Sequence, residues 1–430
     1  MPETRAHAEM PGELSSSGFA ELSEVLRGDF PLLDQVGPDG QQLVYLDTAA
    51  TSLRPRAVLE AVHRFDETCG AAVHRGTHWL AERATAVYEQ ARTAVAEFLG
   101  AEANQFVTTS GTTAALNLAA LLFERAELIP AGSKIVATEA EHHSNLLPWQ
   151  ALAQRLGAQF DWIEVTQDGQ LDLNQLDKID QRTKLVAFTH ASNVTGALSD
   201  VEQLVSQASR YGAWTVLDAA QSAAHQPFNF AALGVDLAAC SAHKMLGPTG
   251  VGCLLGRSEL LQVLPPAVLG GGMVEVVTKT GASYQPPPQR FEAGTAPVAQ
   301  LVGWAAALDY LGQWGTARLA EREQLLTNYL LDAVTQLPGV QILGPAAGLV
   351  SRLGVVSVVV DSVHPHDVGQ YLSARGIAVR VGHHCAIPLH HALGAVASTR
   401  ASIGPYTTVA ELDRFVEALG QVRAYFGVDQ

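Results

Sequence analysis

The sequence predicts an α/β protein with a mostly parallel central sheet in a large domain and a smaller α+β domain at the C-terminal end. Three observations support this prediction. Short apolar runs alternate with helical stretches through the first two thirds of the chain, small or polar loops follow the apolar runs, and three prolines at 286–288 precede a different pattern. Alternating strands and helices are typical of parallel sheets that helices cover on both faces.

The N-terminal third supplies the first elements. We expect residues 1–28 to form a flexible leader. A strand-like run over 44–46 ends at Asp47, and apolar residues at helical spacing predict a helix over 82–99 that Gly100 ends. We assign residues 29–300 to the large domain, whose N-terminal segment could pack on the smaller one, and residues 301–430 to the small domain.

Five apolar runs in the large domain each lead into a polar or small-residue loop. The runs are 106–108, 134–138, 185–189, 214–217 and 237–240, and the loops contain residues 110–113, 141–143, 190–193, 218 and 241–244. Ligands bind at the carboxyl ends of the strands in such sheets. The sequence therefore predicts that these five loops form one site.

The C-terminal part follows another pattern. We predict one long helix over about 297–337, strands over 355–360 and 378–381, and helices over 365–375 and 408–426. A unit of this composition would form the small domain and would carry the segment around Cys385.

Composition limits the classes of function. The 430 residues carry a formal net charge of −16, which disfavours binding to nucleic acid, and no apolar run is long enough to span a membrane. The N-terminus lacks the apolar core of a signal peptide. Four widely spaced cysteines do not suggest a disulfide framework. These features predict a cytoplasmic protein that binds neither nucleic acid nor membrane.

Asp218 and Lys244 follow neighbouring strands in the predicted sheet. Each residue alone has an ordinary explanation, because Lys244 could form a structural ion pair and Asp218 could cap a helix. Together they match two needs of pyridoxal phosphate, which binds a lysine as a Schiff base and requires a carboxylate beside its ring nitrogen. We therefore predict a site for this cofactor.

The third need of this cofactor is a phosphate site. Thr112 and Thr113 follow Gly111 at the predicted start of a helix, where free N–H groups and hydroxyls bind anions. Ser241 and His243 flank Lys244 and can also donate. An ordinary helix N-cap is the alternative interpretation of Gly111 to Thr113. The glycine-rich stretch 247–252 lacks the ending of a Walker loop.

Cys385 lies in the run Arg380-Val381-Gly382-His383-His384-Cys385, which Pro388 follows closely. A neighbouring positive charge lowers a thiol pKa and favours the reactive thiolate. Two other interpretations are a small buried thiol and a metal site. Consecutive side chains diverge in an extended chain and chelate poorly, and no other ligand pair has zinc spacing, so we predict no metal.

These motifs resemble those of the class V aminotransferase family and, within it, the Suf-type (group II) cysteine desulfurases. The resemblance covers roughly residues 44–425. It rests on residues 218–221 and 241–250, on the Cys385 segment, and on further runs at 45–51, 73–78, 141–149, 192–196 and 291–295, in matching order. It implies the fold type I of pyridoxal-phosphate-dependent transferases, and L-cysteine as substrate.

The resemblance also implies roles for individual residues. It implies that Lys244 binds the cofactor and acts in catalysis, and that Asp218 pairs with the ring nitrogen of the cofactor. It implies that His142 stacks on the ring, and His142 is an acid/base candidate because histidine titrates near neutral pH. The remaining implied roles are hydrogen bonds near the ring hydroxyl (Asn193, Gln221), binding of the phosphate (Thr112, Thr113, Ser241, His243), contact with the phosphate of a second subunit in a homodimer (Thr295), and binding of the substrate (Arg400, with Arg380 and Asn193). Cys385 would then accept sulfur as a persulfide and pass it to a SufE-like or related acceptor for iron–sulfur cluster assembly.

Other functions share these motifs. Selenocysteine lyase is the nearest alternative, and a β-lyase or epimerase would not need Cys385. A cofactor-binding scaffold without activity would tolerate loss of Lys244, Asp218 and Arg400. Val381 and Thr407 depart from the family pattern near the expected substrate end of the site.

Overall fold

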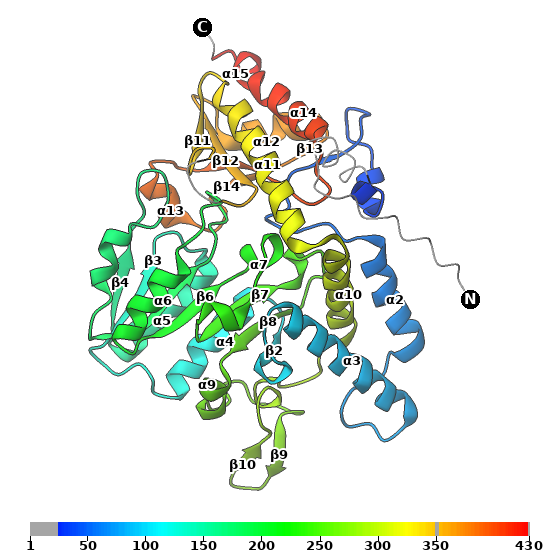
Figure 1. Cartoon of the computed structure of the whole chain (residues 1–430), viewed down its shortest axis with the longest axis vertical. Helices are drawn as coiled ribbons and strands as arrows, with labels where there is room; N and C mark the ends of the chain where they lie inside the picture. The colour runs from blue at the N-terminus through cyan, green and yellow to red at the C-terminus, as the bar shows by residue number, and fades with distance from the viewer. Residues whose placement is uncertain (1–24, 349–351, 429–430) are drawn as a thin grey trace.

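The computed structural model describes residues 25–348 and 352–428. It consists of a larger part around a seven-stranded sheet and a smaller part around a four-stranded sheet, which stands above the larger part in the view of Figure 1. The predicted leader falls mostly on residues 1–24, which lie outside the described residues. Among the described residues, no helix combines the length and apolar character needed to cross a membrane.

The larger sheet has the strand order β2-β8-β7-β6-β5-β3-β4. Only β8 runs antiparallel to its neighbours, so the prediction of a mostly parallel sheet is confirmed. The other strands all end at one edge of the sheet. The strands are β2 (Phe106–Thr109), β3 (Lys134–Thr138), β4 (Gln159–Ile163), β5 (Thr183–Thr189), β6 (Trp214–Asp218), β7 (Leu237–Ser241) and β8 (Gly252–Gly256).

Helices bury both faces of this sheet. In β5, Val186 and Phe188 belong to one apolar core, and Leu185 and Ala187 belong to the other. Successive side chains of a strand point to opposite faces, so this alternation explains why residues 185–188 of the strand are all apolar. The helices of the larger part are α2 (Arg56–Cys69), α3 (Trp79–Phe98), α4 (Thr112–Arg125), α5 (Leu147–Leu156), α6 (Val201–Arg210), α7 (Ser222–His225), α8 (Phe230–Leu233), α9 (Ser258–Val263) and α10 (Val298–Trp314).

The smaller sheet is antiparallel, with the order β11-β12-β15-β14. Its strands are β11 (Val340–Leu343), β12 (Val355–Val360), β14 (Arg380–Gly382) and β15 (Ser398–Ser402), and its helices are α11 (Thr316–Thr335), α12 (Pro365–Ser373), α13 (Ile387–Ala392), α14 (Val409–Gly420) and α15 (Val422–Tyr425). The short strand β1 (Val44–Tyr45) pairs with β13 (Ile377–Ala378). Val44 and Leu46 are buried in the core of this smaller part.

The prediction of one long helix over 297–337 is wrong. Gly315 has φ 80° and separates α10 from α11. A left-handed conformation of this kind favours glycine and ends a helix. The side chains of α10 are buried with those of α2 and α3, and the side chains of α11 are buried in the smaller core. The domain division near residue 300 stays a prediction, and this packing favours Gly315 as its position.

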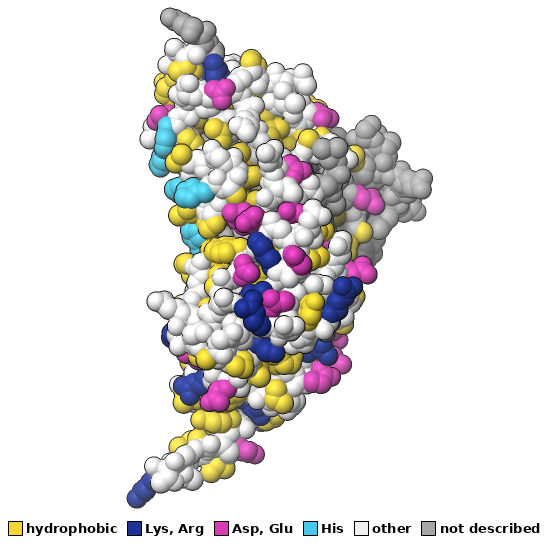
Figure 2. Space-filling view, turned by 90° about the vertical axis from the view of Figure 1, so that its left-hand side faces the viewer, with side chains coloured by type: hydrophobic (Ala, Val, Ile, Leu, Met, Phe, Trp, Pro, Cys, Tyr) yellow, Lys and Arg dark blue, Asp and Glu magenta, His cyan; other side chains and the backbone are white. Residues whose placement is uncertain are grey.

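A hairpin of β9 (Val274–Val277) and β10 (Ala282–Tyr284) extends from the larger part at the end farthest from the smaller sheet. Val276 and Val277 are exposed on it. Figure 2 shows hydrophobic side chains along this projection.

Candidate active site

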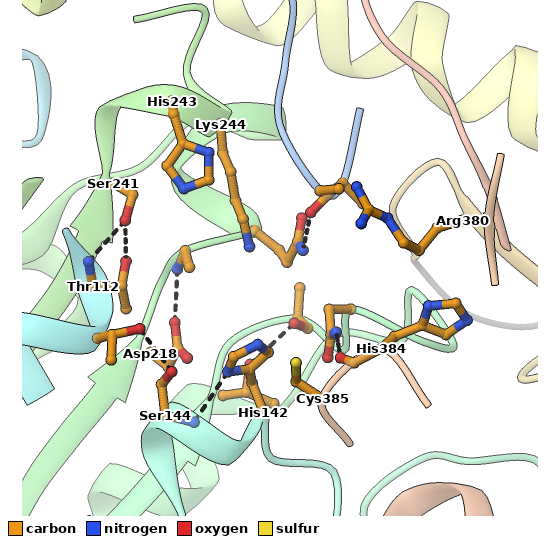
Figure 3. A pocket seen from close by; sticks show the side chains of 18 of the residues that line it. Thr112, His142, Ser144, Asp218, Ser241, His243, Lys244, Arg380, His384 and Cys385 are labelled. Atoms are coloured by element: carbon orange, nitrogen blue, oxygen red, sulfur yellow. Dashed lines mark hydrogen bonds between the residues drawn. The ribbon is translucent and has the colours of Figure 1, made fainter. Parts of the chain in front are cut away.

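A cavity of about 250 Å³ lies at the carboxyl edge of the larger sheet, and residues of the smaller part close one side of it (Figure 3). The strand ends of the larger part bring catalytic and cofactor candidates to the cavity, and the smaller part brings the rest. The predicted residues that line it are Thr112, Thr113, His142, Asn193, Asp218, Gln221, Ser241, His243, Lys244, Arg380, Cys385 and Arg400.

Lys244 and Asp218 enter this cavity from adjacent strand ends. Lys244 ends a short turn after β7, and Asp218 ends β6. Burial lowers the pKa of Lys244 to about 8, although the nearby Asp218 opposes the shift. Burial also raises the pKa of Asp218, whose Oδ1 accepts a hydrogen bond from Ala220 N at 2.9 Å. A positively charged ring nitrogen beside Asp218 would replace the missing solvation of its carboxylate.

The start of α4 and the end of β7 form a group of hydrogen-bond donors at one end of the cavity. Thr112 N donates to Ser241 Oγ at 2.7 Å, and Thr113 Oγ1 lies 2.8 Å from Ser144 Oγ. No side chain caps this helix at Gly111, where an added Cβ would lie 3.3 Å from Ser241 Oγ. These hydroxyl and N–H groups at a helix start fit a phosphate.

Polar side chains in the middle of the cavity could hydrogen-bond to a polar ring. Gln221 Nε2 donates to Ala49 O at 3.0 Å. Its Oε1 is buried and has no hydrogen-bond partner among the described residues. Asn193 Nδ2 donates to His384 O at 2.6 Å, so its amide also holds the loop that carries Cys385. Burial and Lys244 lower the pKa of His243 to about 4, so this side chain is neutral near pH 7. The residues present therefore fit pyridoxal phosphate.

His142 has a defined tautomer. Its Nδ1 accepts a hydrogen bond from Ser144 N at 3.0 Å, so the proton of the neutral ring lies on Nε2. Burial and the charge of Lys244 lower the pKa of His142 to about 4. The expectation that this residue titrates near neutral pH is therefore wrong. As a neutral imidazole, His142 can donate from Nε2 but does not carry a charge at pH 7.

Arg380 and Arg400 are directly opposite each other on β14 and β15, and they share a carboxylate that the sequence did not single out. Arg380 Nη2 lies 2.7 Å from Asp47 Oδ2, and Arg400 Nη2 lies 3.5 Å from Asp47 Oδ1. Arg400 Nη1 also donates to Asn193 O at 2.9 Å. Arg400 is almost completely buried, whereas the Arg380 side chain is 49% exposed.

Cys385 is exposed at the cavity, and the other three cysteines are buried. The interpretation of Cys385 as a small buried thiol is therefore wrong. His384 and Cys385 have φ values of 50° and 56°, which place two consecutive non-glycine residues in the left-handed region. Strained backbone of this kind is frequent at functional sites. Cys385 O accepts from His143 N at 2.7 Å, and His143 Nε2 accepts from Ile387 N at 3.2 Å.

Thr295 does not line this cavity. It lies with Arg75 and Glu292 in another cavity of about 560 Å³. Its role toward a second subunit stays a prediction. Within residues 25–348 and 352–428, His, Cys, Asp and Glu side chains form no group of three or more that could hold a metal ion.

Four residues at or beside the site were not identified as site residues from the sequence: Asp47, Glu141, Ser144 and His384. Asp47 ends the apolar run 44–46, and Glu141 precedes His142, so strand-end position was the available signal. The two departures from the family pattern lie outside the cavity lining. Val381 faces Gly369 of α12, and buried Thr407 accepts from Gly404 N at 2.9 Å through Oγ1.

Comparison with known proteins gives concordant results. Residues 44–415 match the model of the family "Aminotransferase class-V". The chain is 49% identical to "Probable cysteine desulfurase 2" of Mycobacterium leprae (strain TN), with 94% of this chain and 97% of that protein covered. It is 46% identical to "Probable cysteine desulfurase" of Streptomyces coelicolor (strain ATCC BAA-471 / A3(2) / M145), with 94% and 98% covered.

A solved structure has the same fold over nearly its whole length. The apo structure of a cysteine desulfurase from Thermococcus onnurineus NA1 matches with a TM-score of 0.88 and 39% identity, and 93% of this chain and 97% of that chain are covered. Because the family model and relatives above 40% identity both extend over most of the sequence, the chain belongs to the class-V aminotransferase family.

Proposed function

We propose that this protein is a pyridoxal-phosphate-dependent cysteine desulfurase, which removes sulfur from L-cysteine and releases L-alanine. The observation that carries the proposal is the placement of exposed Cys385 on the same cavity as Lys244 and Asp218. A transaminase needs the lysine and the carboxylate but no thiol beside them. The relatives named cysteine desulfurases support the same activity.

Pyridoxal phosphate, when bound, would withdraw electrons from the substrate and so stabilise negative charge at its Cα. Lys244 would hold the cofactor covalently, and Asp218 would pair with its ring nitrogen. Thr112, Thr113, Ser241 and His243 would hold its phosphate, and His142, Asn193 and Gln221 would contact its ring.

The chain's own residues then divide the reaction among them. Arg400 holds the substrate carboxylate, because a guanidinium group can donate two parallel hydrogen bonds to it. Arg380 adds positive charge at the same end. Lys244, whose pKa is lowered to about 8, is neutral often enough near pH 7 to take the Cα proton.

Cys385 completes the transfer. Its thiolate attacks the substrate sulfur, a new S–S bond forms, and the substrate C–S bond breaks with its electron pair left on the carbon fragment. Protons taken up by that fragment, for which the Nε2–H of His142 is a candidate donor, give L-alanine. The persulfide on Cys385 then passes to an acceptor thiol by exchange.

Finer assignments follow from the sequence motifs. We propose that the enzyme belongs to the Suf-type (group II) subgroup, that it acts as a homodimer in the cytoplasm, and that its acceptor is a SufE-like or related protein in iron–sulfur cluster assembly. The exposed position of Cys385 supports transfer to a protein acceptor, because a partner thiol must reach the sulfur.

The decisive experiment incubates the holoprotein with L-cysteine, quantifies alanine, and locates the persulfide by mass spectrometry. Cys385→Ser should keep the cofactor absorbance and lose both the persulfide and the release of alanine. Cys69→Ser, which changes a buried helix residue, is the matched control and should behave as the wild type. A protein persulfide in Cys385→Ser would disprove the role of Cys385. Failure of the wild type to release alanine would instead favour a scaffold.

A further inference from the structure

The hydrogen bonds behind the Cys385 loop fix the protonation of His384. His390 Nδ1 lies 3.0 Å from Ala386 O, and a carbonyl oxygen only accepts, so this nitrogen carries a proton. Burial lowers the pKa of His390, so its ring is neutral and its Nε2 is an acceptor. Ser398 Oγ lies 3.0 Å from that Nε2 and must donate its proton to it.

Ser398 Oγ has only one proton, so toward the second histidine it accepts. His384 Nε2 lies 2.9 Å from the same oxygen and therefore carries the proton of its ring. Burial lowers the pKa of His384 to about 2, so the ring is neutral and its Nδ1 has a free lone pair. That Nδ1 is buried and has no partner among the described residues.

A second buried polar atom, a donor, also lacks a partner. Arg400 Nε is buried and likewise has no hydrogen-bond partner within the described chain. Arg400 and Ser398 are two residues apart on β15, so their side chains extend from the same face of the sheet.

The electrostatic environment agrees with this arrangement. After burial, Arg400 is the group that most lowers the pKa of His384, and both residues hydrogen-bond to Asn193. Figure 3 shows that the His384 ring points away from the Cys385 sulfur, so this ring does not act on the thiol directly. A buried donor and a buried acceptor, both unpaired, each cost free energy until they meet a partner.

We propose that His384 is a positioning residue for Arg400. The hydrogen bonds from His390 through Ser398 keep Nδ1 of His384 unprotonated. This nitrogen accepts the Arg400 Nε–H when the two Nη groups of Arg400 hold the substrate carboxylate. Nε is the guanidinium donor that a carboxylate held by both Nη groups leaves unused. A fixed acceptor for it would orient the plane of the guanidinium group. The inference deepens the proposed function, because it rests on Arg400 as the carboxylate site.

Two substitutions separate this role from simple anchoring of the loop. His384→Asn places an amide oxygen near the position of Nδ1 but loses the reach to Ser398. His384→Gln keeps a donor near the position of Nε2, facing Ser398, but removes the acceptor at Nδ1. If His384 positions Arg400, the His384→Asn variant should therefore still bind the substrate carboxylate. If His384 only anchors the loop through Ser398, the His384→Gln variant should still bind the carboxylate.

The measurement is the Kd of L-alanine for each holoprotein by calorimetry, together with KM and kcat for L-cysteine. We expect His384→Gln to raise Kd and KM about tenfold, as for loss of one hydrogen bond to a charged group, with kcat changed less than about threefold. His384→Asn should stay within about threefold of the wild type. The opposite order, or equal effects of the two variants, would overturn the proposal.

A second readout does not depend on turnover. In protein labelled with ¹⁵N-histidine, the His384 signals should show a protonated Nε2 and an unprotonated Nδ1, and acetate should shift the Nδ1 signal in the wild type but not in Arg400→Gln. A protonated Nδ1, or no difference between these two proteins, would overturn the inference. Failure of the proposed function would appear differently, as absence of alanine release by a wild type whose His384 signals behave as expected.

Discussion

Arg380 Nη2 lies 2.7 Å from Asp47 Oδ2, so one of the two guanidinium groups at this end of the cavity forms an ion pair with a carboxylate. The same Asp47 lies 3.5 Å from Arg400 Nη2. The two arginines differ in solvent access, because Arg400 is buried and the Arg380 side chain is 49% exposed. Their contributions to substrate binding should differ accordingly.

Arg400→Lys should therefore raise KM for L-cysteine by about 10- to 100-fold, since a lysine cannot donate two parallel bonds to a buried carboxylate. Arg380→Lys is the matched control and should change KM only a few-fold, because solvent screens its charge. Steady-state kinetics test both, and cofactor absorbance verifies that each variant is loaded. Equal increases in KM would contradict Arg400 as the main carboxylate ligand.

The pKa of Lys244 predicts how the empty protein takes up pyridoxal phosphate. Burial lowers this pKa to about 8, and only the neutral amine attacks the aldehyde of the cofactor. The fraction of neutral amine grows as pH rises, so the rate of covalent capture should rise about tenfold per pH unit below 8 and level off above it.

Stopped-flow absorbance between pH 6.5 and 9.5 measures this profile directly. Lys244→Ala should bind the phosphate reversibly and show no covalent capture at any pH. A rate that still rises steeply at pH 9.5 would mean that the amine keeps the pKa of a solvated lysine, and the burial argument would then fail.

Much of the large domain could be predicted from the sequence because its strands are buried on both faces. The runs at 134–138 and 214–217 coincide with β3 and β6 within one residue, and the helix predicted over 82–99 corresponds to α3. No strand was predicted at β8, which begins at Gly252, the last residue of the glycine-rich stretch 247–252. Its antiparallel direction depends on pairing with β2 and β7, which local sequence does not encode.

In the candidate site too, some features could be predicted from the sequence, and others depend on the folded structure. Strand-end position and residue chemistry identified Lys244, Asp218 and Cys385, all of which line the cavity. The neutral state of His142 could not be predicted, because it arises from burial and from the charge of Lys244 in the folded chain. Asp47 was missed because its partners Arg380 and Arg400 lie more than 300 positions away in sequence.

Glu141 is a buried carboxyl group beside the site, and its hydrogen bonds link the ends of β3 and β5 with the short turn that ends at Asn145. Its oxygens accept from Thr138 Oγ1 at 2.5 Å, Asn145 Nδ2 at 2.6 Å and Thr189 N at 2.8 Å. Glu141→Ala leaves these buried donors unpaired and should lower the free energy of unfolding by about 2–4 kcal/mol. Urea unfolding measures this change, and Glu139→Gln, which alters a less buried neighbour, should change it by less than about 1 kcal/mol.

The pKa of Glu141 also predicts a pH dependence of stability. Burial raises this pKa to about 8, so the folded protein keeps the proton up to that pH, whereas the unfolded chain loses it above about 4.5. The folded state thus binds more protons between these values, and stability falls as pH rises. The wild type should lose up to about 2 kcal/mol more than Glu141→Gln between pH 6 and pH 8, because glutamine does not titrate. If the free energy of unfolding of the two proteins changed with pH in parallel, the raised pKa of Glu141 would be contradicted.

Val381 and Gly369 form a size-matched contact between β14 and α12. A Cβ added at Gly369 would lie 2.6 Å from Val381 Cγ1, which is too close for both to remain in place. The valine that departs from the family pattern is thus accommodated by a glycine inside a helix, where glycine is otherwise unfavourable. The side chain of Val381 is used in packing and does not line the cavity.

Gly369→Ala should therefore destabilise the protein by about 1–3 kcal/mol, because β-branched Val381 is stiff and cannot move aside easily. In a Val381→Ala background the overlap is gone, and the same substitution should instead stabilise the helix by about 0.5–1 kcal/mol. Urea unfolding of the four proteins gives the coupling energy between the two positions. Additive effects would show that the two side chains do not compete for space. KM for L-cysteine should change little in all four proteins, because neither residue lines the cavity.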